Sequence, residues 1–324
     1  MRHFKLAEPQ SLEQVTALAG GGEGSGFLLA GGTDLLGEIK DEIIEPGLVV
    51  DLGTVPDMVF CREEESGIRI GAMTTLADLA EMSVIQSFYP GFYQALLSVA
   101  TPQIRNVGTV GGNLCQRPRC WYYRDNQALC RKKGGSRCYA LRGKNKYHAI
   151  LGGGMCSIVH PSDLAPVLTA LGADIVIHSS QGEKTVPIED FFTLPSVGIR
   201  KENILESSEF ITEIWLPLPK QAQKSAYCKF KERGTWDFAV VSAAVCGVVS
   251  GTVFRELDIV AGGVAPIPWR LEEVEDRLKG KEISESLIRQ ATRDSLIEAK
   301  PLSDNAYKKE LLETVVSRAL MSLI

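Results

Sequence analysis

The hydrophobic positions in the first two thirds of the chain fall into short runs separated by glycine and proline. Helical spacing of apolar positions predicts helices over residues 11–19, 74–82, 92–100 and 160–173. The favoured N-cap residues at their starts are Ser11, Thr74 or Thr75, and Ser162. Short apolar runs predict strands at residues 27–30, 47–52 and 68–72 and a hairpin over 174–188. Residues 209–219 predict an edge strand, because Pro217 and Pro219 close it.

The last third of the chain has a different pattern. Three apolar runs predict an antiparallel meander at residues 226–233, 238–249 and 252–265. Three amphipathic stretches then predict helices at residues 271–280, 283–299 and 305–324. Strands followed by segregated helices are typical of an α+β fold. We therefore expect an α+β protein with a boundary near residue 220, which divides the chain into domains 1–219 and 220–324.

Composition narrows the class of protein. Hydrophobic residues make up 44% and charged residues 23% of the 324 positions, the proportions of a soluble globular protein. The net charge of −5 argues against nucleic-acid binding as the main function. No apolar run approaches the ~20 residues of a membrane-spanning helix, and the first residues lack the apolar core of a signal peptide. We expect a cytoplasmic protein that does not bind membranes.

Five of the eight cysteines gather between residues 115 and 156, in a segment without apolar periodicity. Because disulfides are rare in cytosolic proteins, this clustering indicates metal chemistry. Four thiolates can hold zinc or an iron–sulfur cluster, and the wide spacing of Cys120, Cys130, Cys138 and Cys156 does not decide between them.

The same segment carries a strong positive charge. Against one acid, Asp125, stand ten basic residues: Arg117, Arg119, Arg124, Arg131, Lys132, Lys133, Arg137, Arg142, Lys144 and Lys146. Cationic surroundings stabilise thiolates and an anionic cluster, and they suit an acidic electron carrier or partner subunit. The alternative interpretation is a solvated surface loop.

Two glycine turns are candidates for binding a phosphate-bearing cofactor. The strand predicted at 27–30 leads into a Gly-Gly-Thr-Asp turn, and a Gly-Thr-Val-Gly-Gly-Asn loop follows at 108–113. Glycine lets the backbone approach a ligand, and successive N–H groups can bind an anion such as a pyrophosphate. Each turn alone is equally well explained as an ordinary turn, but two in one domain favour a cofactor. The dinucleotide pattern G-x-G-x-x-G is absent from both turns and from the glycine-rich segment 20–26.

The start of the helix predicted at 160–173 offers two further polar residues. His160 could act as a base or metal ligand, but a lone histidine at a helix start more often makes a local hydrogen bond. Asp163 in the first turn suits the helix dipole. No Ser/His/Asp or Cys/His nucleophilic set and no H-E-x-x-H stand out.

The segments 28–35, 100–114, 160–173 and 229–245 together resemble the FAD-binding medium subunits of the xanthine dehydrogenase and carbon monoxide dehydrogenase family of molybdenum hydroxylases. The resemblance covers essentially the whole chain. It implies a two-subdomain FAD-binding domain followed by a smaller α+β domain with an antiparallel sheet and helices. It also implies that the backbone around the first glycine turn wraps the pyrophosphate, through Leu29, Ala30, Gly31, Gly32, Thr33, Asp34 and Leu35.

The resemblance assigns further residues to FAD. Thr109, Gly112 and Asn113 would form a second phosphate and ribityl wall. Asp163 would be a polar partner of the cofactor, Leu205 would pack on the isoalloxazine ring, and Lys231 would approach the polar edge of that ring. The loop 232–237 would lie near the flavin face, where an external acceptor docks.

The cysteine-rich segment resembles a subgroup of that family with an inserted [4Fe–4S] cluster. The subgroup includes the beta subunit of 4-hydroxybenzoyl-CoA reductase and the flavin subunit of periplasmic aldehyde oxidoreductases. The resemblance implies an inserted loop at about 115–156, with Cys115 outside the ligand set and four ligands: Cys120, Cys130, Cys138 and Cys156.

The chain lacks the C-x4-C-x2-C pattern of a plant-type [2Fe–2S] cluster and is too short for a molybdopterin domain. The resemblance therefore implies two partners, a molybdopterin-containing large subunit and a [2Fe–2S] small subunit. This oxidoreductase subunit would relay electrons among the partner clusters, FAD, its own cluster and a carrier such as ferredoxin or NAD. The alternatives are a stand-alone flavin-dependent oxidoreductase of related fold and a zinc-bound scaffold without activity.

Overall fold

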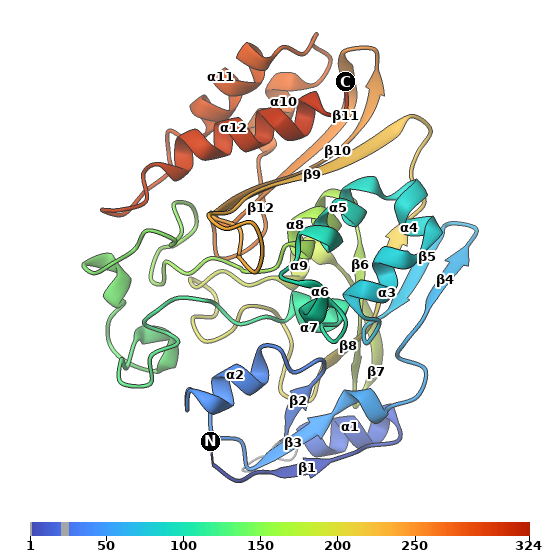
Figure 1. Cartoon of the computed structure of the whole chain (residues 1–324), viewed down its shortest axis with the longest axis vertical. Coiled ribbons are helices and arrows are strands. Elements are labelled where there is room, and N and C mark those ends of the chain that lie inside the picture. The colour runs from blue at the N-terminus through green and yellow to red at the C-terminus, as the bar shows by residue number, and fades with distance from the viewer. Residues whose placement is uncertain (1, 21–25) are drawn as a thin grey trace.

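The computed structural model describes residues 2–20 and 26–324, so most of the glycine-rich segment 20–26 lies outside the described residues. Three sheets follow one another along the long axis of the molecule (Figure 1). The N-terminal sheet lies at the bottom of that view, and the C-terminal sheet with its helices lies at the top. The observed mixture of antiparallel sheets and separate helices confirms the predicted α+β fold class.

The first sheet is small and parallel, with the strand order β1-β3-β2. Its strands are β1 (Lys5–Ala7), β2 (Phe27–Leu29) and β3 (Leu48–Asp51), and its helices are α1 (Leu12–Ala19) and α2 (Leu35–Lys40). A short 3-10 helix, Leu52–Thr54, follows β3. Because β2 stops at Leu29, the first glycine turn lies between the end of a strand and the start of α2.

The second sheet has five antiparallel strands in the order β4-β5-β8-β6-β7. These are β4 (Cys61–Glu64), β5 (Gly67–Gly71), β6 (Asp174–Ser179), β7 (Gly182–Pro187) and β8 (Phe210–Pro217). The prediction of an edge strand at 209–219 is wrong, because β8 pairs with β5 on one side and β6 on the other. A proline is tolerated there because Pro217 is the last residue of the strand, and Pro219 lies beyond it.

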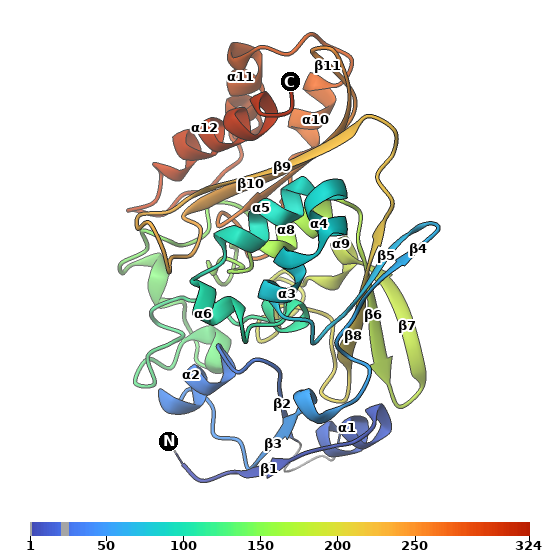
Figure 2. The same cartoon turned by 45° about the vertical axis from the view of Figure 1, so that its right-hand side comes forward.

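Helices cover one face of the five-stranded sheet (Figure 2). They are α3 (Leu76–Glu81), α4 (Ser83–Phe88), α5 (Pro90–Ser98), α6 (Pro102–Arg105), α7 (Val110–Leu114), α8 (Leu164–Ala170) and α9 (Ile188–Phe191). Phe92, Leu96 and Leu168 are fully buried from the helix side, in one core with Ile70 and Ile175 of the sheet. The helices therefore hold the glycine loops at their ends in fixed positions relative to the sheet.

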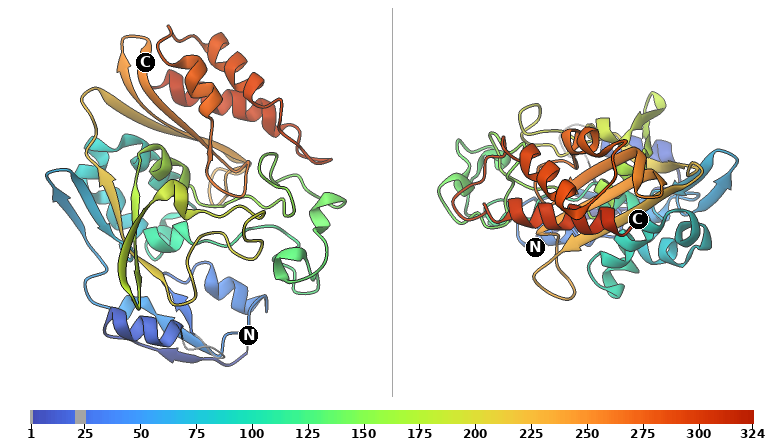
Figure 3. Two further views of the ribbon diagram at one scale, coloured as in Figure 1. Left: turned by 180° about the vertical axis from the view of Figure 1, so that it is seen from behind. Right: turned by 90° about the horizontal axis from the view of Figure 1, so that it is seen from above.

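The third sheet confirms the predicted meander, with antiparallel strands in the order β12-β11-β10-β9. Its elements are β9 (Gln223–Phe230), β10 (Val241–Ser250), β11 (Val253–Gly262), β12 (Trp269–Arg270), α10 (Glu272–Leu278), α11 (Glu285–Ser295) and α12 (Lys308–Met321). The three helices pack on one face of the sheet (Figure 3), whereas α5 and α8 contact the other face. No described helix is long and apolar enough to cross a membrane.

The predicted helix caps form where the sequence placed them. Ser11 Oγ accepts a hydrogen bond from Gln14 N at 3.3 Å, and Thr75 rather than Thr74 caps α3. Ser162 Oγ accepts from Ala165 N at 2.9 Å, although α8 itself begins at Leu164. These bonds satisfy N–H groups that the first helical turns leave without intrahelical partners.

The cysteine-rich segment between α7 and α8 contains only two short 3-10 helices, Arg131–Lys133 and Tyr139–Leu141. It runs along the side of the molecule, from the level of the N-terminal sheet to the C-terminal helices (Figure 1). Its far end is bound to the chain before α12, where Asn145 Nδ2 donates to Ser303 Oγ at 3.0 Å and Asn305 Nδ2 donates to His148 O at 2.9 Å. Contacts with other elements therefore position this segment.

Lys308 is the buried part of this connection. It is fully buried, and its Nζ donates to Tyr147 O at 2.8 Å and to Gly263 O at 2.7 Å. Burial lowers the pKa of Lys308 to about 7. One side chain of α12 thus joins the cysteine-rich segment to the end of β11.

We expect Lys308→Met to lower the free energy of unfolding by about 1–3 kcal/mol, because two buried carbonyls lose their donor. The partly exposed neighbour Lys309 provides the matched control, Lys309→Met. Between pH 7 and 10 the unfolded wild-type chain keeps a proton on Lys308 that the folded chain has lost, so wild-type stability rises with pH. Urea titrations between pH 7 and 10 measure this dependence. If the unfolding free energy of Lys308→Met rose with pH as much as that of the wild type, Lys308 would not be its source.

Candidate functional site

The two glycine turns lie on one cleft. Residues from both turns line it, together with the start of α8 and a loop after β9. The first turn can lie against the chain just before the second because Gly31 has no side chain. A Cβ at Gly31 would lie 1.9 Å from Val107 O. Gly32 has a φ of +71°, a conformation that glycine adopts without strain. The second turn is fixed by Thr109, whose Oγ1 accepts a hydrogen bond from Gly112 N at 3.1 Å.

Most of the residues expected at the FAD site line this cleft. They are Ala30, Gly31, Gly32, Thr33, Asp34, Leu35, Thr109, Gly112, Asn113 and Asp163. Leu29, Leu205 and Lys231 do not line the cleft. Leu29 lies in β2 opposite Asp51, and Lys231 follows the end of β9. Leu205 packs against the hydrophobic core that the helices share with the five-stranded sheet. Their roles toward FAD stay predictions.

A buried polar network surrounds Asp163, which lines the cleft. The carboxylate of Asp163 accepts hydrogen bonds from Lys229 Nζ at 2.6 Å and from Tyr227 OH at 2.7 Å. Lys229 also donates to Ser98 O at 3.1 Å. Burial raises the pKa of Asp163, and the Lys229 ammonium acts in the opposite direction. The same burial raises the pKa of Tyr227 well above its ordinary value, so this phenol stays a hydrogen-bond donor.

Lys229, not Lys231, is therefore the lysine that contacts Asp163. Successive side chains of a strand point to opposite faces, so Tyr227 and Lys229 share one face of β9. Alternation alone does not separate Lys229 from Lys231, and the two differ because β9 ends at Phe230, between them. Lys231 interacts with Asp163 only through a longer-range attraction.

The outer rim of the cleft comes from Trp236, Asp237 and Phe238, which overlap the loop predicted to lie near the flavin. Trp236 is exposed and has a φ of 50°, and its N–H donates to Ala100 O at 3.2 Å. Ala100 has a φ of 42°. Left-handed backbone at residues other than glycine costs energy, so the surrounding contacts must hold these two residues in place.

Cys120, Cys130, Cys138 and Cys156 line one small cavity at the side of the cleft, together with Lys132 and His148. His148 Nε2 lies 3.2 Å from Cys120 Sγ, and burial lowers the pKa of this histidine to about 4. Burial raises the pKa of Cys156 to about 11, which the Lys132 ammonium opposes. Cys115 lines the cleft and not the thiol cavity.

The cavity that the four thiols surround has a volume of about 10 Å³. Among residues 2–20 and 26–324, no group of three or more His, Cys, Asp or Glu side chains is arranged to hold a metal ion. Four cysteine thiols are a donor set that holds either an iron–sulfur cluster or zinc. A further cavity lies between the two sites, since it shares Arg119 and Phe238 with the cleft and Cys120 and His148 with the thiol cavity.

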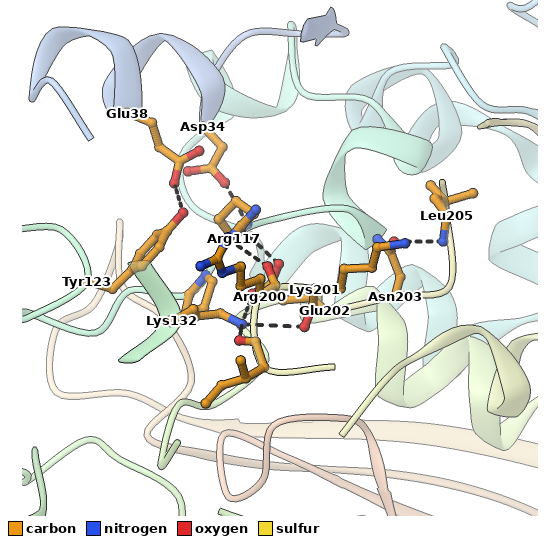
Figure 4. Close-up of polar contacts among 12 residues, drawn as sticks. Asp34, Glu38, Arg117, Tyr123, Lys132, Arg200, Lys201, Glu202, Asn203 and Leu205 are labelled. Carbon is orange, nitrogen blue, oxygen red and sulfur yellow. Dashed lines mark hydrogen bonds and ion pairs between the residues drawn. The ribbon is translucent and has the colours of Figure 1, made fainter. Parts of the chain in front are cut away.

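Carboxylates and cations join the cysteine-rich segment to the cleft (Figure 4). Glu38 Oε1 accepts from Tyr123 OH at 2.7 Å, and burial raises the pKa of Glu38. Glu202 forms ion pairs with Lys132 and, at 2.9 Å, with Arg117 Nε. These contacts bring three chain regions together that lie far apart in the sequence.

His160 makes a local hydrogen bond, as expected from its place at the helix start. Its Nδ1 accepts from Ser162 N at 3.4 Å, and burial lowers the pKa of His160 to about 4. The imidazole is therefore neutral at pH 7, and it does not line the main cleft.

Replacing Lys229 tests the buried network. We expect Lys229→Met to lower the free energy of unfolding by about 3–5 kcal/mol, because Asp163 becomes a buried carboxylate without its cation. Lys231→Met is the matched control and should change stability by no more than about 0.5 kcal/mol. Urea unfolding of both variants measures this, and equal losses would contradict the assignment of Lys229.

Gly31 tests the approach of the two turns. Gly31→Ala places a Cβ against Val107 O, so we expect a loss of about 1–3 kcal/mol in stability and weaker retention of added FAD. Gly37 in α2 faces open space, and Gly37→Ala should bind FAD like the wild type. Flavin absorbance after gel filtration measures retention. Full retention by Gly31→Ala would show that the contact is dispensable.

Comparison with known proteins identifies the family. A family model described as the FAD binding domain in molybdopterin dehydrogenase matches residues 2–219. A second, described as the CO dehydrogenase flavoprotein C-terminal domain, matches residues 225–323. Both matches together span nearly all of the chain.

Individual relatives agree with these matches. The aldehyde oxidoreductase FAD-binding subunit PaoB of Escherichia coli K12 is 33% identical over 296 residues, which cover 90% of this chain and 89% of that protein. The carbon monoxide dehydrogenase medium chain of Hydrogenophaga pseudoflava is 29% identical over 322 residues, with 98% and 96% covered. A solved structure of carbon monoxide dehydrogenase from that organism superposes with a TM-score of 0.77 at 28% identity, covering 99% and 97% of the two chains. The chain therefore belongs to the FAD-binding medium subunits of the molybdenum hydroxylase family, and it is a subunit of an oxidoreductase.

Proposed function

We propose that the cleft between the two glycine turns is the FAD site of this subunit. The observation that carries the proposal is the convergence of both turns and Asp163 on one cleft, although they come from three separate parts of the chain. The backbone of residues 29–35 would bind the pyrophosphate, and Thr109, Gly112 and Asn113 would form the opposite wall. Asp163, held by Lys229, would contact the polar part of the cofactor, and Leu205 and Lys231 would lie near the isoalloxazine ring.

We further propose that Cys120, Cys130, Cys138 and Cys156 hold a [4Fe–4S] cluster, as in the subgroup that includes the beta subunit of 4-hydroxybenzoyl-CoA reductase. Two observations support this. The four thiols line a single cavity, although 36 positions separate the first from the last. Lys132 and Arg131 line the same cavity, and cations stabilise an anionic cluster.

The chain would then act as an electron-transfer subunit. Bound FAD supplies the capacity to exchange one or two electrons, and the protein holds and tunes the cofactor. We propose a cytoplasmic complex with a molybdopterin-containing large subunit and a [2Fe–2S] small subunit. The relative from Hydrogenophaga pseudoflava is a medium chain, and the solved carbon monoxide dehydrogenase of that organism is a form that lacks the Mo-pyranopterin moiety of its molybdenum cofactor. The basic segment favours an acidic carrier such as ferredoxin, with NAD as the other candidate.

Anaerobic purification of the full chain, followed by absorption spectroscopy and analysis of iron, sulfide and zinc, tests both cofactor sites. We expect flavin bands, a broad shoulder near ~400 nm and about four irons per chain. Cys130→Ser should remove most of the iron and leave the flavin detectable. The control is Cys228→Ser in β9, a cysteine outside the thiol cavity, which should keep both cofactors.

Each other outcome contradicts a stated part of the proposal. Flavin without iron would overturn the cluster, and stoichiometric zinc would replace it by a structural metal site. Turnover of a substrate by the isolated chain would favour a stand-alone flavin oxidoreductase. A chain that binds no added FAD would contradict the assignment of the cleft.

A further inference from the structure

The two glycine turns contribute no cationic side chain to the proposed FAD cleft. Among the described lining residues, the only cationic side chains are Arg117 and Arg119. The acidic ones are Asp34, Glu38, Asp163 and Asp237. An anionic pyrophosphate therefore meets cations only from the first residues of the cysteine-rich segment. Both arginines lie within three positions of Cys120.

Asp34 fixes these arginines relative to the first glycine turn. Its carboxylate accepts from Arg117 N at 2.7 Å and forms ion pairs with Arg119 Nη1 at 2.9 Å and Arg124 Nη2 at 2.8 Å. Asp34 stands at the N-cap position of α2 but makes no side-chain cap bond there. The Asp34 carboxylate thus binds the cysteine-rich segment and does not cap its own helix.

Arg119 has donor capacity left for a ligand. One nitrogen pairs with Asp34, and the guanidinium lies 4.9 Å from the centre of the Phe238 ring. The buried Nε of Arg119 has no hydrogen-bond partner in the described chain. A buried donor without a partner is costly, so a bound group with an acceptor oxygen would relieve that cost. Arg119 lines both the cleft and the intermediate cavity that reaches Cys120.

The segment that carries the arginines has little structure of its own. Between Cys115 and Cys156 it forms only two 3-10 turns, and two of its four cavity thiols are buried side chains. Binding of a metal cluster to a segment of this kind contributes free energy to its folding. A group bound in the thiol cavity would therefore add to the contacts of Asp34 and Glu202 that hold Arg117 and Arg119.

We propose that Arg117 and Arg119 are FAD-binding residues and that, through them and Asp34, binding of the cluster and binding of FAD strengthen each other. The inference rests on the proposed function. Loss of the cluster loosens the arginines and weakens FAD binding. Because coupling between two sites is reciprocal, bound FAD slows loss of the cluster.

The test uses the full chain in four forms: wild type, Arg119→Gln, Asp34→Asn and, as a control, Arg142→Gln. Arg142 is an exposed arginine of the same segment. The FAD dissociation constant is measured by quenching of flavin fluorescence, with the cluster present and after its removal by a chelator. We expect removal to weaken FAD binding on the order of tenfold in wild type and Arg142→Gln. In Arg119→Gln and Asp34→Asn the change should fall below about twofold.

A second measurement does not depend on the variants folding well. Iron release from the wild-type chain to a chelator is followed with and without saturating FAD, and FAD should slow it several-fold. The coupling is overturned if FAD affinity is the same with and without the cluster. It is also overturned if iron release is the same with and without FAD. Neither result contradicts the two proposed cofactor sites. A chain that binds FAD but never iron overturns the proposed cluster and this inference together.

Discussion

The buried ion pair between Lys229 and Asp163 is the interaction on which the arrangement of the cleft depends. It joins the third sheet to the residue that precedes α8, and it lies beneath the glycine turns. Removing two charges from water is expensive and is offset only when their hydrogen bonds are complete. Tyr227 and the carbonyl of Ser98 complete them here. A shift of β9 by one residue would turn Lys229 to the other face, so the pair also fixes the register of that strand.

The cysteine-rich segment is held by polar contacts at its two ends and not by a hydrophobic core. It contributes few residues to either hydrophobic core, and polar contacts hold it at both ends. At one end its arginines bind Asp34, and at the other Lys308 and Asn305 bind its backbone carbonyls. Hydrogen bonds and ion pairs of this kind are directional, so they define the position of the segment without a packed interior.

Local patterns in the sequence predicted much of this structure. Helix caps at Ser11 and Thr75, the C-terminal meander and the glycine turns follow from residue types whose preferences act over a few positions. Contacts between residues far apart in the chain cannot be predicted from such local preferences. The sequence gives no sign that Asp34 binds arginines more than eighty positions later, and prolines at the end of β8 suggested an edge for a strand that is central. The contact of Lys229 with Asp163 is also distant in sequence, because 66 positions separate the two residues.

The central position of β8 has a consequence for the order in which the molecule can assemble. Gly71 pairs with Glu213, so β5 completes its sheet only after more than a hundred further residues have been made. During synthesis the cysteine-rich segment precedes β8, while the β4–β5 hairpin still lacks its neighbour. Contacts this distant in sequence form slowly, because a long loop must close first. The cysteine-rich segment, whose own residues line the thiol cavity, is thus made while the central sheet beside it is still incomplete.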